Sequence, residues 1–209
     1  MAEATATAVV DNSRQQFFIF THHSSVSSFA TSSSLITAPE TYLSNYPGIK
    51  CNYTATGALV FDSSDSLTPR ILLIQRSKTD TLPSLWEFPG GSCDDDDLSI
   101  LHAVARELWE ETGLNATKIG PLVGMLHFFL SRSGRLACRF NFLVEVERDR
   151  EVEGSLEVKL DPAEHQRFVW ASEGEVRAKK VGGVDLKFTS REVECTVLEA
   201  FKSRGSELV

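Results

Sequence analysis

The sequence predicts an α/β sandwich, because short apolar segments typical of strands are interleaved with two substantial helical segments. The strand signals are runs of apolar and β-branched residues bounded by polar or Gly-containing turns. We expect strands at residues 53–61, 70–76, 126–130, 136–146 and 168–171. The turn at residues 131–134 joins two of these segments and predicts a hairpin.

The first predicted helix runs up to residue 112 and has one apolar face. Leu101, Val104 and Leu108 recur at spacings of three and four residues, which places them on a single stripe that faces a core. Gly113 follows as the expected left-handed cap. We expect the four consecutive aspartates at 94–97 to supply the N-cap, where negative charge is favourable.

Three carboxylates gather at the end of this helix. Glu107 lies one helical turn before both Glu110 and Glu111, so two like-charge contacts cost roughly 0.2–0.5 kcal/mol each. The negative end of the helix dipole adds to the repulsion. Arg106 stands beside the cluster, and its guanidinium can hold carboxylates in a fixed orientation. The pattern therefore predicts that a cation binds at this helix end.

The second predicted helix lies near the end of the chain. Thr189 and Glu192 have the spacing of a capping box. The helix that follows would bury four apolar residues, namely Val193, Val197, Leu198 and Phe201.

The acidic segment resembles the Nudix box, G-x5-E-x7-R-E-U-x-E-E-x-G-U, in which U is apolar. The preceding segment 86–91, Trp-Glu-Phe-Pro-Gly-Gly, also resembles the strand end found before the box in that family. Every fixed position in the second half of the box is matched, from Arg106 to Leu114. The first half departs from it, because Asp97 stands in place of Glu and eight residues, not seven, separate it from Arg106. Asp95 or Asp96 are alternatives for that role.

The resemblance covers about residues 50–203. It implies an α/β/α sandwich with a mixed sheet and the box helix packed on it. It also implies a hydrolase that cleaves a diphosphate linkage in a nucleotide or nucleotide derivative by attack of water on phosphorus. The substrate would be a small anionic diphosphate.

The resemblance further implies a set of metal ligands. Glu107 and Glu111 would be the principal ligands, Glu110 a further ligand or a binder of coordinated water, and the Gly90 carbonyl would complete the shell. Carboxylate oxygens are hard ligands that suit Mg²⁺, with Mn²⁺ as an alternative. Arg106 and Glu110 are therefore also assigned to the catalytic group.

A general base is expected in the loop before the last strand. Glu164 is the candidate, and Glu153 and Glu157 are alternatives. A surface glutamate without a catalytic role is equally compatible with this position. The neighbouring His165 is expected to be a solvated loop residue.

Three residues are candidates for substrate contact. The rings of Trp170 and Phe88 can stack on a nucleobase, and Arg76 can meet a terminal phosphate. Strand aromatics more often pack in the core, so that role is the alternative for both rings.

Two other functional classes stay open. One is a hydrolase of a non-nucleotide diphosphate, such as a prenyl or inositol compound. The other is a Nudix-like domain with altered chemistry, either a binding or regulatory domain or a repurposed cyclase or isomerase. The altered first half of the box motivates the second class.

Composition limits partners and compartment. The net charge of -8 argues against a nucleic acid polymer as partner, whereas bound divalent cations would still admit a small anion. Four scattered cysteines favour reduced thiols in the cytoplasm, or alternatively the nucleus. No apolar run is long enough for a membrane span, and the N-terminus lacks a secretory signal. A homodimer remains open.

The chain length favours one domain with an extension. Residues 1–38 are rich in Ser, Thr and Ala and are expected to be a partly mobile extension, in which the aromatic cluster 17–20 packs as an edge strand or arm. Residues 39–209 are expected to form a single domain, opening with a short helix after Pro39.

Overall fold

The computed structural model describes residues 18–31, 48–62, 68–131, 133–148 and 156–206. The elements are β1 (Thr21–His22), η1 (Ser24–Phe29), β2 (Tyr53–Asp62), β3 (Arg70–Arg76), β4 (Trp86–Glu87), α2 (Ile100–Thr112), β5 (Ala116–Leu122), β6 (His127–Leu130), β7 (Leu136–Val146), β8 (His165–Ser172), α3 (Glu173–Ala178), β9 (Lys180–Val181), β10 (Val184–Asp185) and α4 (Arg191–Ser206). The predicted helix after Pro39 and the predicted boundary at residue 38 lie outside the described residues.

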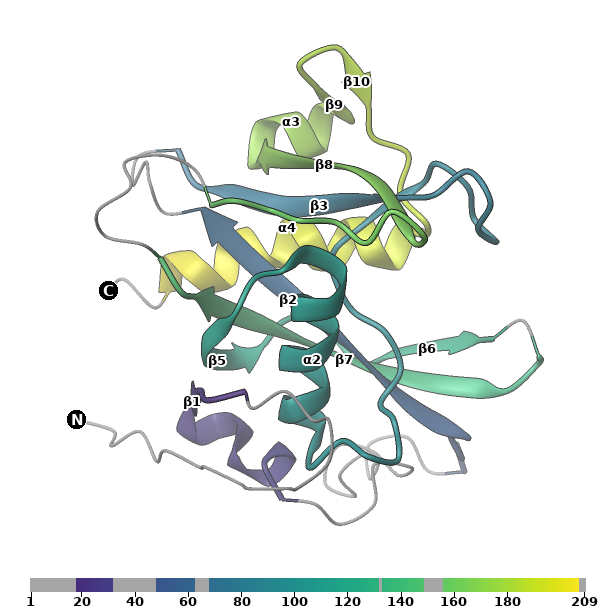
Figure 1. The fold of residues 1–209 in the computed structure, drawn as a ribbon, viewed down its shortest axis with the longest axis vertical. Helices are drawn as coiled ribbons and strands as arrows, with labels where there is room; N and C mark the ends of the chain where they lie inside the picture. Colours follow the sequence, from purple (N-terminus) through teal and green to yellow (C-terminus); the bar gives the residue numbers. More distant parts are fainter. Residues whose placement is uncertain (1–17, 32–47, 63–67, 132, 149–155, 207–209) are drawn as a thin grey trace.

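A mixed sheet forms the centre of the molecule, in the strand order β1-β5-β7-β2-β3-β4. The long strands β2 and β7 pair in parallel along most of their length. The edge of β7 away from β2 carries the antiparallel strands β5 and β6, and β8 runs antiparallel to β3. The predicted hairpin at residues 126–146 is therefore present as β6 and β7 (Figure 1).

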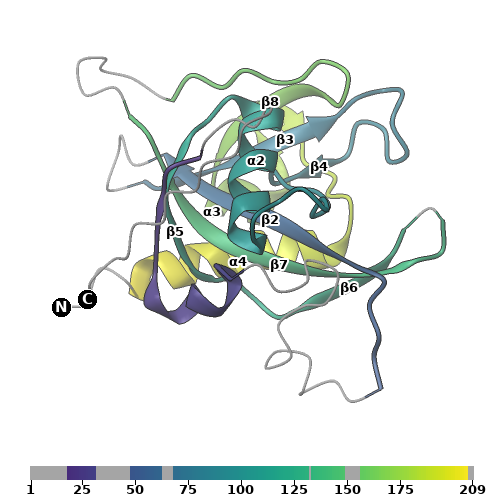
Figure 2. The same ribbon diagram turned by 60° about the horizontal axis from the view of Figure 1, so that its bottom comes forward.

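Helices cover the two faces of this sheet (Figures 1 and 2). Alternation along β2 decides which face each side chain joins. Ala58 and Val60 pack in the core under α2, whereas Leu59 packs in the core under α4. The predicted stripe of α2 is buried at all three positions, namely Leu101, Val104 and Leu108. The α/β sandwich predicted from the sequence is confirmed.

The described part of the N-terminal extension packs against the core beside α2. β1 pairs in parallel with β5 at the edge of the sheet. η1 then buries Val26 and Phe29, and the Phe29 ring lies edge-on to Phe140 and Phe142 at centroid distances of 4.9 and 5.4 Å. Phe18 and Phe20 of the expected aromatic arm also pack against this core, and residue 17 lies outside the described residues.

The N-cap of α2 differs from the sequence-based expectation. Ser99 caps the helix, because its side chain accepts the hydrogen bond of the His102 N–H at 3.1 Å. The expected aspartate cap is wrong, since Asp97 is held elsewhere, as described below. The other end agrees with the prediction, because Gly113 has φ 70° and stops the helix in the left-handed conformation.

The start of α4 is also shifted by one residue. Ser190 provides the cap, because its hydroxyl accepts from the Val193 N–H at 3.2 Å. Thr189 was expected in this place, but its N–H donates to the Trp86 carbonyl at 3.0 Å, which ties the helix start to β4. The expected burial of Val193 and Val197 is confirmed.

Two further structural features concern the state of the cysteines and the character of the helices. All four cysteines are free thiols. None of the helices in the described ranges has the length and apolar character needed to span a bilayer.

We expect Phe29→Ala to destabilise the protein by about 3–5 kcal/mol, because it empties a filled site between η1 and the sheet. Ile19→Ala, at a position that is 73% exposed in the same segment, should change stability by less than about 0.5 kcal/mol. Chemical denaturation of both variants measures the difference. Equal, small effects would show that η1 does not contribute to the folded core.

Candidate functional site

Arg106 organises the acidic end of α2. Its Nε and Nη2 donate to the two oxygens of Asp97 at 2.9 and 2.8 Å. Its Nη1 donates to Glu107 at 3.0 Å and to Glu110 at 2.9 Å. Its Nη2 also donates to the Ser92 carbonyl at 2.9 Å. One planar cation therefore holds three carboxylates and the preceding loop in fixed positions.

Asp97 is the buried anchor of this network, with a side chain that is 1% exposed. Besides Arg106, it accepts from His102 Nδ1 at 3.1 Å and from the Asp94 N–H at 2.8 Å. Burial acts to raise its pKa, but these donors outweigh burial and lower the pKa to about 2. Asp97, which stands in place of the first glutamate of the box, thus binds Arg106 despite the inserted residue. His102 supports Asp97, and the sequence analysis did not identify it.

Glu107 lies against the backbone where two glycines follow β4. A Cβ atom on Gly91 would lie 2.5 Å from the Glu107 carboxylate, so glycine leaves the space that the side chain fills. Burial raises the pKa of Glu107 to about 7, with Glu110 and Asp94 adding to the shift and Arg106 opposing it. A carboxylate with this pKa readily exchanges a proton for a cation near neutral pH.

Glu111 is the most deeply placed acid of the helix end, at 6% exposure. Its Oε2 accepts from the Gly90 N–H at 2.7 Å. Gly90 has φ 148°, and a Cβ there would lie 2.3 Å from the Thr56 carbonyl oxygen, so only glycine lets the chain pass this close. Burial raises the pKa of Glu111 well above its usual value, and the nearby carboxylates, Glu107 first, add to this effect.

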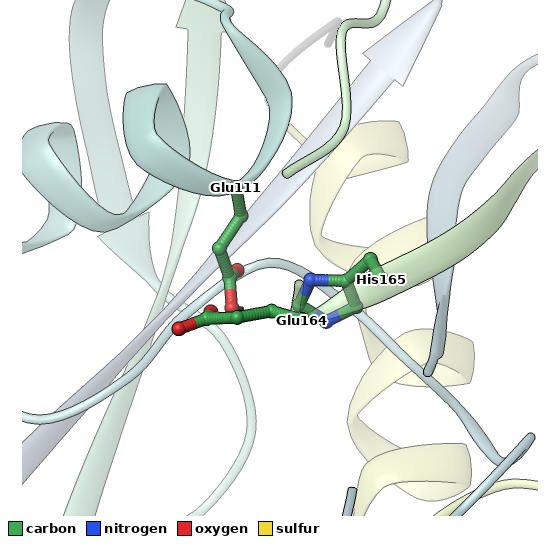
Figure 3. Close-up of side chains that lie close together, drawn as sticks. All are labelled: Glu111, Glu164 and His165. Atoms are coloured by element: carbon green, nitrogen blue, oxygen red, sulfur yellow. Dashed lines mark ion pairs between the residues drawn. The ribbon is translucent and has the colours of Figure 1, made fainter. Parts of the chain in front are cut away.

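Glu164 and His165 reach the same place from the start of β8. One ligand atom each from Glu111, Glu164 and His165 lie within 4.8 Å of one another (Figure 3). Glu164 itself is exposed, but His165 is 2% exposed, so the expectation of a solvated loop histidine is wrong. His165 pairs with Arg76 next to a register shift in the pairing of β3 with β8, which the sequence does not signal.

Glu87 is a second buried acid that the sequence analysis did not select. It lies 5% exposed on β4, accepts a hydrogen bond from Arg76, and faces His165 Nε2 at 3.6 Å. Its position between the buried rings of Trp86 and Phe88 is the available signal, because a charged residue flanked by core aromatics needs a partner.

The residues at this helix end fit a divalent cation. They offer hard oxygen ligands, among them the buried carboxylate of Glu111 and the partly buried carboxylate of Glu107, and the pKa values of both are raised. The described arrangement brings Glu111 toward Glu164, whereas Glu107 and Glu110 face Arg106. The ligand roles of Glu107, Glu110 and the Gly90 carbonyl stay predictions.

The three candidate substrate residues lie in other surroundings. Phe88 is 1% exposed and belongs to the core under α4, which leaves its ring unavailable for stacking. Trp170 is half-buried and packs against the core under α2. Arg76 is engaged by Asp80 at 2.5 Å and by Glu87. Their roles in substrate binding stay predictions, and this packing gives them little support.

The alternative bases also have defined positions. Glu157 is exposed and lies 3.7 Å from the Lys159 ammonium, and Glu153 lies outside the described residues. Glu164, by contrast, belongs to the group that converges with Glu111.

A cavity of about 530 Å³ opens beside the Arg106 network. It lies between the loop before α2 and the tip of the β6–β7 hairpin, and its lining includes Tyr53, Ser92, Asp94 and Arg135. The Arg135 guanidinium stands 5.4 Å from the centre of the Tyr53 ring. The volume falls within the range of small-molecule sites.

Solved structures share this fold. The MutT protein from Methanosarcina mazei Go1 is 25% identical, with a TM-score of 0.52 over 73% of this chain and 94% of that one. The NUDIX domain of Shewanella oneidensis NrtR, solved with ADP ribose, is 20% identical, with a TM-score of 0.53 over 80% and 99% of the two chains. A NUDIX hydrolase from Nitrosomonas europaea is 23% identical, with a TM-score of 0.53 over 72% and 88%.

Sequence comparison gives the family. No curated protein sequence matches this chain. The family model of the NUDIX domain matches residues 52–191, which is more than half of the sequence and includes the whole acidic helix end. The chain belongs to the Nudix family.

Proposed function

We propose that this protein is a Mg²⁺-dependent hydrolase that cleaves a diphosphate linkage in a nucleotide or nucleotide derivative. The observation that carries the proposal is the placement of Glu111, which is buried, beside Glu107, which is partly buried, at one helix end, with the pKa values of both raised. Burying two acids beside each other is unfavourable unless a cation or protons neutralise them. The Nudix fold of the chain supports hydrolysis as the use of such a site.

Four groups would hold the cation in this proposal. They are the carboxylates of Glu107, Glu110 and Glu111 and the carbonyl of Gly90. When bound, a divalent cation neutralises phosphate charge and lowers the pKa of an attacking water. Arg106 holds Glu107 and Glu110 in one orientation, and the Gly90 N–H keeps one oxygen of Glu111 in place.

Glu164 would accept the proton of the attacking water. It combines the two properties that a base requires here, namely exposure to solvent and proximity to Glu111. The backbone fixes its position, because the Glu164 carbonyl accepts from the Ser77 N–H at 2.8 Å.

The cavity beside Arg106 supports a nucleotide derivative over the other substrate classes. Tyr53 offers a ring for a base, and Arg135 offers a cation for phosphate. A prenyl chain would need an apolar lining, and an inositol polyphosphate a strongly basic one, whereas this lining is mostly polar and includes Asp94 and Asp95. The ADP ribose bound to the Shewanella NrtR domain, which shares the fold, is a ligand of the proposed class.

A Mg²⁺-dependent phosphate-release screen tests the function. The panel should contain nucleoside triphosphates, dinucleoside polyphosphates, ADP ribose, nucleotide sugars and prenyl diphosphates. We expect turnover of a nucleotide compound. In Glu111→Gln the turnover rate should fall by at least about 100-fold, because mutating a residue that only supports a metal ligand already lowers activity by up to about 100-fold. Glu173→Gln, an exposed acid on α3, is the matched control. Binding without turnover would favour a regulatory domain, and wild-type rates in Glu111→Gln would remove the assigned role.

Glu164→Gln should lower kcat by about 10²–10⁴-fold with little change in Mg²⁺ affinity, because the amide cannot accept a proton. The shape of the pH dependence of kcat/KM should change. A profile with the wild-type shape would exclude Glu164 as the base.

The raised pKa of Glu107 predicts how pH affects the metal-free protein. Because this pKa is about 7 when folded and 4.5 when unfolded, its contribution to stability is fully present below pH 4.5. That contribution, on the order of 3 kcal/mol, is lost as pH rises from 4.5 through 7. Thermal unfolding in EDTA at pH 5 and pH 8 should therefore show a larger loss in the wild type than in Glu107→Gln. Mg²⁺ should restore stability most at pH 8. Parallel behaviour of the two proteins would contradict the assignment.

A further inference from the structure

Phe18 lies outside the region that matches the family model, yet it packs against the helix that carries the acidic cluster. Its ring lies edge-on to His102, with the ring centroids 5.4 Å apart and the planes at 75°. It also lies edge-on to Trp109, at a centroid distance of 6.3 Å. Arg106 lies between these two positions on the same side of α2, about one turn from each. Phe18 therefore packs along the side of α2 that carries Arg106.

Main-chain contacts and burial fix the segment that carries Phe18. β1 pairs with β5, and the His23 N–H donates to the Ile119 carbonyl at 2.9 Å. η1 then places Phe29 in the core, and Phe18 packs against that same core. None of these contacts involves a carboxylate of the α2 end. The place of the Phe18 ring beside His102 is therefore set independently of the acidic residues.

His102 connects Phe18 to the carboxylate that anchors Arg106. Its Nδ1 lies 3.1 Å from Asp97 Oδ1, which is also the oxygen that accepts from Arg106 Nε at 2.9 Å. Because Asp97 has a pKa of about 2, it is ionised at neutral pH and can only accept, so the Nδ1 of His102 carries the proton. Two donors thus converge on one carboxylate oxygen.

We propose that Phe18 positions the guanidinium of Arg106 by holding the ring of His102 in place. An edge-on pair of aromatic rings favours one relative orientation of the two. The His102 side chain is 11% exposed and that of Asp97 1%, so water has little access to the hydrogen bond between them. Without the Phe18 ring, the imidazole gains room to turn and water gains access to the shared oxygen of Asp97.

The consequence reaches the proposed metal ligands through Arg106. Its Nη1 donates to both Glu107 and Glu110. Because a guanidinium is planar and rigid, a shift where it meets Asp97 also moves its Nη1. The inference rests on the proposed function where it concerns Mg²⁺ binding, whereas the positioning of Arg106 itself does not depend on that function.

The alternative role for Phe18 is packing alone. In that case, replacing its ring would lower the stability of the fold without changing the Arg106 network. Its effects would also add to those of a change at His102. Positioning predicts instead that the two residues are coupled, so that replacing both affects Arg106 no more than replacing His102 alone.

Hydrogen exchange at the Arg106 Nε–H, followed by NMR in the metal-free full chain, tests the positioning. Asp97 holds this proton, which exchanges when the bond opens. Phe18→Leu keeps an apolar side chain but removes the ring, and exchange should become at least about tenfold faster. Phe18→Tyr retains the ring and should exchange like the wild type. Ile19→Ala, at the neighbouring position that is 73% exposed, is the matched control. The absence of the signal in Arg106→Lys identifies it.

His102→Ala and the double variant complete the cycle. We expect Phe18→Leu to have no further effect on exchange when the His102 ring is absent. Wild-type exchange in Phe18→Leu, or effects of the two substitutions that add, would overturn the proposal. Fast exchange in the wild type would overturn it as well, and that result requires no variant to fold.

Calorimetry with Mg²⁺ gives a second readout. The Mg²⁺ affinity should fall by similar factors in Phe18→Leu and His102→Ala, at least about threefold, because both changes act through Arg106. A fall in His102→Ala with none in Phe18→Leu would overturn the proposal. If the wild type binds no Mg²⁺ and turns over no nucleotide, the proposed function is rejected, whereas the exchange rates still decide the role of Phe18.

Discussion

The guanidinium of Arg106 is the interaction on which the acidic helix end depends. Without it, Asp97, Glu107 and Glu110 would repel one another, and Glu107 and Glu110 also lie toward the unfavourable C-terminal pole of the helix dipole. Its planar donors bind all three and also the Ser92 carbonyl, so the loop, the helix and the ligands share one cation. Glu111 lies beyond its reach and relies on the Gly90 N–H instead. In this site, Arg106 balances the charges of Asp97, Glu107 and Glu110, whereas the charge of Glu111 is left for a bound cation to balance.

The sheet explains why these groups meet. Alternation along β2 and β7 sends side chains into two cores, one under α2 and one under α4, and this fixes α2 against the sheet. β8 pairs with β3, and Glu164, which directly precedes β8, therefore lies close to Glu111 in the last turn of α2. Packing of apolar residues therefore determines where the charged ones converge.

Local patterns predicted much of the fold. The strands at 53–61 and 70–76 and the stripe of α2 follow from apolar periodicity, which is a local property. β5 escaped detection because Lys118, Gly120 and Pro121 interrupt any alternation. The aspartate cap was wrong because Arg106 captures Asp97 across nine residues, and the burial of His165 depends on strand register and on the approach of α2. The bond from Arg106 to Asp97 is a side-chain contact that capping preferences do not include, and the pairing of β8 with β3 joins segments that are far apart in the sequence.

The extent of family similarity and the extent of cooperative packing do not coincide in this molecule. The matched region starts after η1 and stops at the first residue of α4. A recombinant fragment cut at those limits would leave the Phe140 and Phe142 rings without Phe29 and would uncover the opposite core by removing Val193 and Val197. Such a fragment would expose two apolar surfaces that favour aggregation, so a recombinant protein should retain residues 18–206.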